Sequence, residues 1–176
     1  MRRASPGPAR SPGSGRRAPT LPPLPGEDYG SPMRLSSPAF GPGEPIPVRF
    51  TCDGADVSPA IEIADLPEGT ACLAVVMDDP DAPMGTWDHW VAYDIPVAAR
   101  VPEGARALGT PGRNSWRKTG YGGPCPPFGE HRYFFKVYAL DRPLGLPPGA
   151  SKKQVLEAMR GRVLAEASLI GRYTRR

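Results

Sequence analysis

The segment that most constrains the fold is residues 71–77, the nearly continuous apolar run ACLAVVM. A short apolar run that follows turn-forming residues is typical of a strand in the core of a sheet. Apolar side chains on both sides of a pleated strand require cover on both faces. We therefore predict a central strand that is buried on both faces and ends at the acidic residues 78–81.

Two further segments alternate as half-buried strands do. In residues 87–95 the alternation places His89 on a largely apolar face with Trp87, Val91, Tyr93 and Ile95. In residues 131–140 it places His131 and Tyr133 together on one face. The 25 prolines and 21 glycines among 176 residues favour many turns and short elements, so we predict a mainly β architecture. Additional short strands are predicted at residues 33–35, 46–50 and 60–63.

A helix is predicted near the C-terminal end, where residues 151–154 form a capping box. Ser151 suits the N-cap and Gln154 the third helical position, where each side chain can satisfy a backbone amide of the other. Apolar residues then recur at helical spacing up to Ile170, and Gly171 suits the position that ends a helix. We therefore predict a helix over residues 152–170 that packs on a sheet, and we attribute Gly161 within it to close packing.

Residues 1–28 contain seven prolines, four glycines and five arginines, with almost no bulky apolar side chains. They cannot bury enough surface to offset the entropy of ordering, so we predict a disordered arm followed by one domain of residues 29–176. This arm carries most of the net charge of +4, and no basic folded face for nucleic acid is indicated. The chain has no signal-peptide pattern and no apolar stretch of the ~18 residues that span a membrane. We expect a cytoplasmic protein without stable membrane anchoring.

Three cysteines make an odd count without CxxC spacing, which indicates neither a zinc knuckle nor a disulfide framework. A reducing compartment fits this pattern best. Cys72 lies within the apolar run and is predicted to be a small core residue. A single bridge between Cys52 and Cys125, both in turn-like settings, is compatible with the sequence but cannot be read from it.

Polar residues gather around both of the chain's two histidines. Asp79 and Asp81 each lie close before a proline, so their loop has restricted backbone freedom. Carboxylates near a histidine should raise its pKa and favour the charged, anion-attracting form, which we expect for His89. His131 follows a segment rich in glycine and proline, where backbone N–H groups of residues 122–123 could bind an anion. We therefore predict that the two blocks meet in one anion-binding pocket.

Other interpretations stay open. Aspartates in loops usually cap turns, and a lone histidine on an apolar strand face is more often a core residue than a ligand. A small hydrolase could use Cys125 as a nucleophile, or could hold a metal with two histidines and an aspartate. Cys125 lacks a helix N-terminus to stabilise its thiolate, and no HxH or HxxxH spacing supports the metal. A homodimeric interaction scaffold, acting through another surface, is the third alternative.

Several separate motifs occur in the order found in one protein family. They are FTCDGADVSPAIEI, DDPDAP, WDHW, GYGGPCPPFGEHRYFFKVYALD and LIGRYTR. From about residue 31 to its end, the chain resembles the phosphatidylethanolamine-binding proteins, in particular the bacterial and archaeal branch called Raf kinase inhibitor-like. The resemblance implies a Greek-key antiparallel β-sandwich with a C-terminal helix and few other short helices.

The resemblance also implies a small surface pocket for phosphate-like or other anionic head groups. Carried over from the matching motifs, its lining would be Asp79, His89, Gly123, Pro124, His131 and Tyr133, with Asp81 in a supporting position. On this basis we expect a non-enzymatic protein without a cofactor, which binds a small anionic or phosphorylated ligand and regulates a kinase or protease partner. A homodimer is a further expectation. The name of the branch does not establish kinase inhibition, because a fold and a pocket do not fix the partner.

Overall fold

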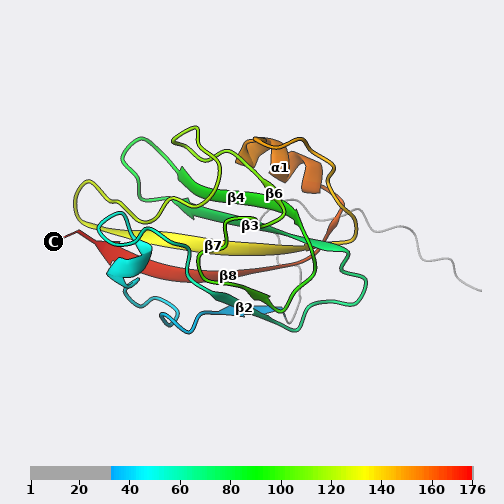
Figure 1. Ribbon diagram of the computed structural model, residues 1–176, viewed down its shortest axis with the longest axis horizontal. Coiled ribbons are helices and arrows are strands. Elements are labelled where there is room, and N and C mark those ends of the chain that lie inside the picture. The colour runs from blue at the N-terminus through cyan, green and yellow to red at the C-terminus, as the bar shows by residue number, and fades with distance from the viewer. Residues whose placement is uncertain (1–32, 176) are drawn as a thin grey trace, which may run out of the picture.

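The computed structural model describes residues 33–175, so the arm predicted at residues 1–28 lies outside the described part of the chain. In chain order the elements are β1 (Arg34–Ser36), a 3-10 helix (Val48–Phe50), β2 (Ile61–Ala64), β3 (Cys72–Asp79), β4 (Trp87–Ile95), β5 (Arg100–Val101), β6 (Thr110–Pro111), β7 (Glu130–Leu140), α1 (Lys152–Met159) and β8 (Val163–Thr174). The strands form a five-stranded sheet of order β6-β4-β3-β7-β8 and a three-stranded sheet of order β1-β2-β5 (Figure 1). All pairs within these sheets are antiparallel, which confirms the predicted mainly β class. None of the helices within residues 33–175 is long and apolar enough to cross a membrane.

The predicted central strand is β3, and all eight of its residues are buried. Leu73 and Val75 pack in the core between the two sheets. Ala74 and Val76 point the other way, into a second core that includes Val155 of α1. Burial of each large aliphatic side chain stabilises the folded state by about 1.5–3 kcal/mol, so the residues on both faces of β3 contribute to the stability of the domain. Asp79 is the last residue of the strand, and it lies on the same face as the residues that pack in the core between the sheets.

A bulge in β4 breaks the alternation next to this end of β3. Met77 pairs with Trp90, but the next residue, Asp78, pairs with Asp88. His89 is therefore an extra residue in β4 that has no partner in β3. Such a bulge re-aims the side chains around it and is frequent beside functional sites.

The bulge places His89 on a different face from the one predicted. Trp90 belongs to the core between the sheets, and the His89 ring packs against Tyr133 of the same core. Val91 and Tyr93 belong instead to the core beneath α1. The prediction that His89 shares a face with Val91 and Tyr93 was wrong, because strict alternation does not include the extra residue.

The N-terminal end of α1 is as predicted. The Ser151 hydroxyl accepts a hydrogen bond from the Gln154 amide (3.3 Å), and the Gln154 side-chain oxygen accepts one from the Ser151 amide (2.9 Å). These two bonds satisfy amides that the first helical turn leaves unpaired. Val155 and Met159 then pack against the outer face of the five-stranded sheet, where α1 lies beside the β4 and β6 end (Figure 1).

The predicted helix is wrong beyond Met159, because Val163–Thr174 is the strand β8, which pairs with the whole length of β7. Gly161 has a φ of +68°, a left-handed conformation that glycine adopts readily and that ends the helical path. Leu169 and Tyr173 are both buried and lie an even number of residues apart, so the segment also fits the two-residue period of a strand. Pairing with β7 decides between the two periods, and that pairing is not a local property of the segment.

The strand predicted at residues 46–50 was also wrong. This segment contains the 3-10 helix Val48–Phe50, in which the Phe50 amide donates to the carbonyl oxygen of Pro47 (3.0 Å). Pro45 and Pro47 have no amide hydrogen to contribute to a strand ladder, which disfavours pairing at these positions. The turn brings Phe50 into the core between the sheets.

Gly171 in β8 lies where a side chain would be too close to its neighbours, so even an alanine should destabilise the fold. A Cβ atom at this position would lie 2.5 Å from Cγ1 of Ile46 and 2.8 Å from Cε2 of Phe40. Overpacking of this kind costs about 1–3 kcal/mol, so Gly171→Ala should lower the free energy of unfolding by that amount. Urea denaturation measures the change. Ser168→Ala, at an exposed position of the same strand, should change it by less than about 0.5 kcal/mol, and equal effects would contradict the packing argument.

Candidate anion-binding site

Asp79 and His131 form a buried pair at one end of the five-stranded sheet. Asp79 is the last residue of β3 and His131 is the second residue of the neighbouring antiparallel strand β7. The Nδ1 atom of His131 lies 2.7 Å from Oδ2 of Asp79, and each side chain is 5% exposed. A carboxylate this buried is costly unless it is paired. The contact orients the imidazole and leaves its Nε2 atom as the nitrogen by which a ligand would be bound.

His89 is held by a different partner. Its Nδ1 atom lies 2.7 Å from the carbonyl oxygen of Gly122, and because a carbonyl only accepts, Nδ1 carries the proton. The ring packs edge-on against Trp116 and Tyr133, at centroid distances of 4.9 and 5.2 Å. Burial lowers the pKa of His89, although the Gly122 carbonyl and the charge of Asp79 oppose this shift. Asp79 therefore acts in the expected direction, but burial outweighs it, so the expectation of a raised pKa and a charged His89 ring was wrong.

The pKa of His89 is expected to lie below the ordinary value of about 6.5. With a folded-state pKa below the unfolded one, the stability linked to this group is complete above about pH 6.5. It is lost as the pH falls through the folded-state pKa. An NMR titration of the ring protons over about pH 4 to 8 measures the shift. Trp116→Ala, which exposes the ring to water, should bring the pKa back toward 6.5; a wild-type value at or above 6.5 would contradict this account.

The side chains of Asp79, His89 and His131 line one cavity of about 290 Å³. We call it the His–Asp cavity. It brings together the acidic loop after β3, the bulge of β4 and the start of β7, which are distant in sequence. The remaining lining residues are Ala82, Pro83, Met84, Trp87, Trp116, Cys125 and Pro127.

Tyr133 lies beside the His–Asp cavity rather than in its lining. It is fully buried and packs against the ring of His89. Its hydroxyl lies near the Asp79 side chain and the Cys125 backbone, but no group among residues 33–175 forms a hydrogen bond of good geometry with it. Burial, and secondarily the charge of Asp79, raises the pKa of Tyr133, so the hydroxyl stays protonated and able to donate.

The backbone amides of Gly122 and Gly123 are committed to the fold. The Gly122 amide donates to the carbonyl oxygen of His89 (3.0 Å), and the Gly123 amide donates to Oδ1 of Asp56 (2.7 Å). Gly123 lines a neighbouring cavity of about 350 Å³, and Pro124 is buried. The structure therefore does not bring Gly123 or Pro124 into the His–Asp cavity, and the two amides are not free to bind an anion there.

Asp81 lies in the same loop but has other partners. Its carboxylate forms two hydrogen bonds with the Arg132 guanidinium (2.9 and 2.8 Å), and its backbone amide donates to Oδ1 of Asp79 (2.8 Å). The hydrogen bonds from Arg132 lower the pKa of Asp81 to about 2. Asp81 is outside the cavity lining, and it ties the acidic loop to the start of β7.

Trp87 and Trp116 also line the cavity, although neither was predicted as a site residue from the sequence. Trp87 and Trp116 pack edge-on at a centroid distance of 5.5 Å. Nε1 of Trp87 is buried and has no hydrogen-bond partner in the described part of the chain. Trp87 could have been suspected from the WDHW motif, but Trp116 comes from a long loop that shows no periodic signal.

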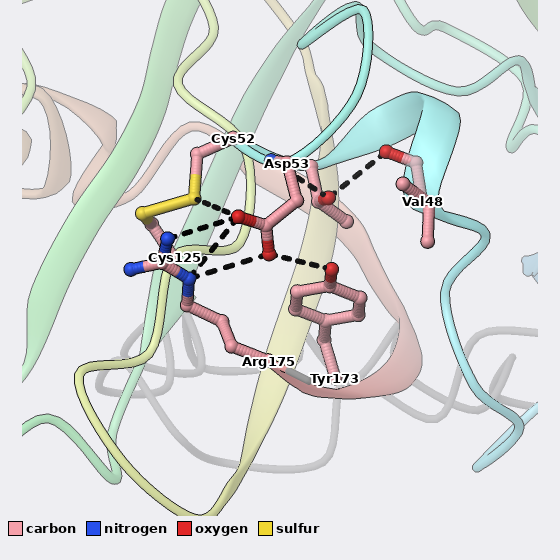
Figure 2. Close-up of polar contacts among 7 residues, drawn as sticks. Val48, Cys52, Asp53, Cys125, Tyr173 and Arg175 are labelled. Carbon is pink, nitrogen blue, oxygen red and sulfur yellow. Dashed lines mark hydrogen bonds and ion pairs between the residues drawn. A yellow bond between two sulfur atoms is a disulfide. The ribbon is translucent and has the colours of Figure 1, made fainter.

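A disulfide joins Cys52 and Cys125, with a Cα–Cα distance of 5.4 Å (Figure 2). It resolves the pairing that the sequence left open. The alternative in which Cys125 acts as a thiol nucleophile is wrong for this form of the protein, because its sulfur is already bonded. The bridge also disagrees with the expected reducing compartment, since disulfides persist mainly in oxidising ones. Cys72 is a buried free thiol, as predicted.

The described residues, 33–175, include no group of three or more histidine, cysteine, aspartate or glutamate side chains placed to hold a metal ion. Asp79 and His131 satisfy each other, and Nδ1 of His89 is engaged by a carbonyl. The metal-dependent alternative therefore gains no support from this arrangement.

A family profile described as Phosphatidylethanolamine-binding protein matches residues 36–174, which include every residue of the His–Asp cavity. The chain belongs to the phosphatidylethanolamine-binding protein family. This membership confirms the resemblance that the motifs indicated.

Relatives of this phosphatidylethanolamine-binding family member come from bacteria and archaea. A UPF0098 protein of Aquifex aeolicus is 51% identical over 155 residues, covering 83% of this chain and 91% of the relative. A crystal structure of a phosphatidylethanolamine-binding protein homolog, CT736 from Chlamydia trachomatis, matches with a TM-score of 0.79 and 39% identity, covering 82% and 98% of the two chains. YbcL of E. coli, described as a new member of the mammalian PEBP family, matches with a TM-score of 0.76 and 30% identity, covering 82% and 99%. These names specify the family and the fold but no activity.

Proposed function

We propose that this protein is a non-enzymatic binding protein whose His–Asp cavity takes a phosphate group or another small oxyanion. The observation that supports the proposal is the presence of both histidines, one of them fixed by a buried carboxylate, in the lining of one cavity. Imidazole rings donate to oxyanion oxygens and become cationic near neutral pH. A volume of about 290 Å³ suits a small ion or the head group of a larger ligand.

The hydrogen bonds of the two rings set a proton requirement for binding. Nδ1 of His89 donates to a carbonyl and Nδ1 of His131 to a carboxylate, so each neutral ring has only a lone pair at Nε2. An oxyanion without a proton cannot donate to that lone pair. Binding should therefore be accompanied by proton uptake on an imidazole, or should select a protonated form of phosphate. The affinity should fall as the pH rises above neutrality.

Two buried donors beside the cavity, Trp87 and Tyr133, are poorly satisfied by the protein and favour a ligand that carries hydrogen-bond acceptors. Nε1 of Trp87 is buried and has no hydrogen-bond partner in the described part of the chain. The Tyr133 hydroxyl is also buried, and its neighbours, the Asp79 side chain and the Cys125 backbone, do not meet it with good hydrogen-bond geometry. An unpaired buried donor costs about 1–3 kcal/mol, which a ligand oxygen within reach would offset. Both residues adjoin the two histidines, because Trp87 lines the cavity and Tyr133 packs on His89.

A second cavity with lysines is a weaker candidate for the same ligand. It has a volume of about 330 Å³ and is lined by Lys136, Lys152 and Asp78. Both lysine ammonium groups lie within 3.0 to 3.1 Å of one carboxylate oxygen of Asp78, and Lys152 also pairs with Asp88. Two carboxylates thus neutralise two ammonium groups, and little charge is left to attract an anion.

The wider role in this proposal is regulatory, with the bound anion or a phosphorylated side chain linking the protein to a partner such as a kinase or protease. Met84, which lines the His–Asp cavity, is 92% exposed, and Phe128, next to the lining residue Pro127, is 70% exposed. Exposed apolar side chains of this kind are available to contact a larger ligand. The bridge between Cys52 and Cys125 is typical of proteins in oxidising compartments. We therefore propose that the protein is located in such a compartment rather than in the cytoplasm. A homodimer stays a proposal.

Calorimetric titration with inorganic phosphate, phosphoserine and acetate tests this function. Titrations in two buffers of different ionisation enthalpy measure proton uptake directly. Phosphate and phosphoserine should bind, with uptake of protons and with an affinity that falls as the pH is raised. Trp87→Phe should weaken binding, whereas Lys136→Ala, in the lysine cavity, should leave it unchanged. Absence of binding by all three compounds would contradict the proposal.

A further inference from the structure

The bridge between Cys52 and Cys125 has one firmly anchored end. Asp53 follows Cys52 and accepts a hydrogen bond from the Tyr173 hydroxyl (2.8 Å); it also pairs with the Arg175 guanidinium (3.0 Å) (Figure 2). Tyr173 belongs to β8, and Arg175 follows that strand directly. The Cys52 end of the bridge is therefore fixed to the five-stranded sheet.

The Cys125 end depends much more on the bridge itself. Cys125 lies between Pro124 and Pro126, and Pro127 follows, so Cys125 alone among these four residues has an amide hydrogen. Its backbone lies near the Tyr133 hydroxyl, which is a weaker anchor than the two side chains that hold Asp53. Cys125 lines the His–Asp cavity, and it also lines the neighbouring cavity of about 350 Å³. Its side chain is thus part of the wall between the two cavities. Loss of the bridge would release this wall from its fixed end.

We propose that the Cys52–Cys125 disulfide is a redox latch that holds the His–Asp cavity in its anion-binding form; this inference rests on the function proposed above. A dithiol reductant supplies the two electrons: its thiolate attacks one bridge sulfur, the S–S bond breaks, and the reductant becomes a disulfide. The two protein sulfurs leave as the thiols of Cys52 and Cys125. Both residues are half-buried and line cavities, so the bridge is accessible to a small thiol.

Reduction should loosen the cavity wall without unfolding the domain, because several contacts between the same two segments persist. The Cys52 amide donates to the carbonyl oxygen of Pro124 (3.1 Å), and the Tyr121 hydroxyl donates to that of Phe50 (2.7 Å). The Gly123 amide also keeps its bond to Asp56. These contacts involve residues up to Pro124, whereas the released segment begins at Cys125.

Phosphate binding by the oxidised and the reduced protein tests the latch. The protein is reduced with dithiothreitol, desalted without oxygen and titrated with inorganic phosphate. The reduced form should bind roughly tenfold more weakly, and reoxidation should restore the affinity. Burial raises the pKa of the Cys72 thiol to about 11, so native alkylation after reduction should label Cys52 and Cys125 but not Cys72. Cys72→Ala is the matched control and should keep the redox dependence.

Hydrogen exchange of the amides in residues 120–129 provides a readout that needs no ligand. Reduction should increase exchange at the amides of Cys125, Phe128 and Gly129, and leave the amides of Gly122 and Gly123, and those of β3 and β7, protected. If neither form binds phosphate, the proposed function fails, and the exchange rates alone decide whether the bridge latches the wall. Equal affinities together with equal exchange rates in the two forms would overturn the latch. Increased exchange throughout the domain would overturn it too, because the bridge would then support the whole fold.

Discussion

Replacing His131 with alanine is expected to weaken the binding of inorganic phosphate by roughly 10- to 100-fold. The substitution removes the imidazole that the His–Asp cavity offers to an oxyanion. It also leaves the carboxylate of Asp79, whose residue is 3% exposed, without its hydrogen-bond partner. An unpaired carboxylate in the cavity repels the anion, so the loss should exceed that of a single neutral hydrogen bond. Calorimetric titration at fixed pH and ionic strength measures it.

Two control variants separate this effect from a loss of folding. Asp81→Asn removes a carboxylate from the same loop, but one that pairs with Arg132 and does not line the cavity, so binding should persist. An uncompensated buried charge costs about 3–5 kcal/mol, and His131→Ala should therefore be less stable. The double variant Asp79→Ala/His131→Ala should regain stability without regaining binding. Wild-type affinity in a folded His131→Ala variant would contradict the site.

Removing the bridge by a Cys52→Ala/Cys125→Ala double substitution is expected to lower the free energy of unfolding by about 4 kcal/mol. The two cysteines are separated by 73 residues, and a cross-link over a loop of this length strongly restricts the unfolded chain. Domains of this size are stable by about 5–15 kcal/mol, so the variant should still fold. Urea denaturation of the oxidised wild type and the double variant measures the difference.

The remaining cysteine provides the matched control for the bridge. Cys72 is buried and free, so Cys72→Ala removes one core sulfur and no cross-link. Its effect should be on the order of 1 kcal/mol and should not depend on added reductant. A loss of less than about 1 kcal/mol in the Cys52→Ala/Cys125→Ala variant would show that the cross-link adds little to the fold.

The strands that position Asp79 and His131 could be predicted from the sequence, because their signals are local and strong. The apolar run before Asp79 requires burial on both faces, and the alternation that begins at His131 persists over ten residues. The capping box at Ser151 is equally local, since it involves residues only three positions apart. These elements carry two of the three polar residues that line the His–Asp cavity.

The features that were predicted wrongly, or could not be predicted, depend on residues far away in the chain. Residues 163–174 fit a helical and a strand period alike, and only pairing with β7 selects the strand. The bulge at His89 arises from the register against β3 and leaves no mark in the alternation itself. The lowered pKa of His89 follows from burial, which the acidic neighbours in the sequence did not reveal. The Cys52–Cys125 pairing likewise joins two turns that only the complete fold brings together.

An NMR titration with inorganic phosphate can follow the imidazole nitrogens of His89 and His131 and thus locate the bound anion directly. If the His–Asp cavity is the anion site, Nε2 of both rings should shift saturably with one common dissociation constant. Signals of Lys136 and Lys152, in the second cavity, should stay unchanged. Saturable shifts confined to the two lysines, or no shift at either histidine, would contradict the claim.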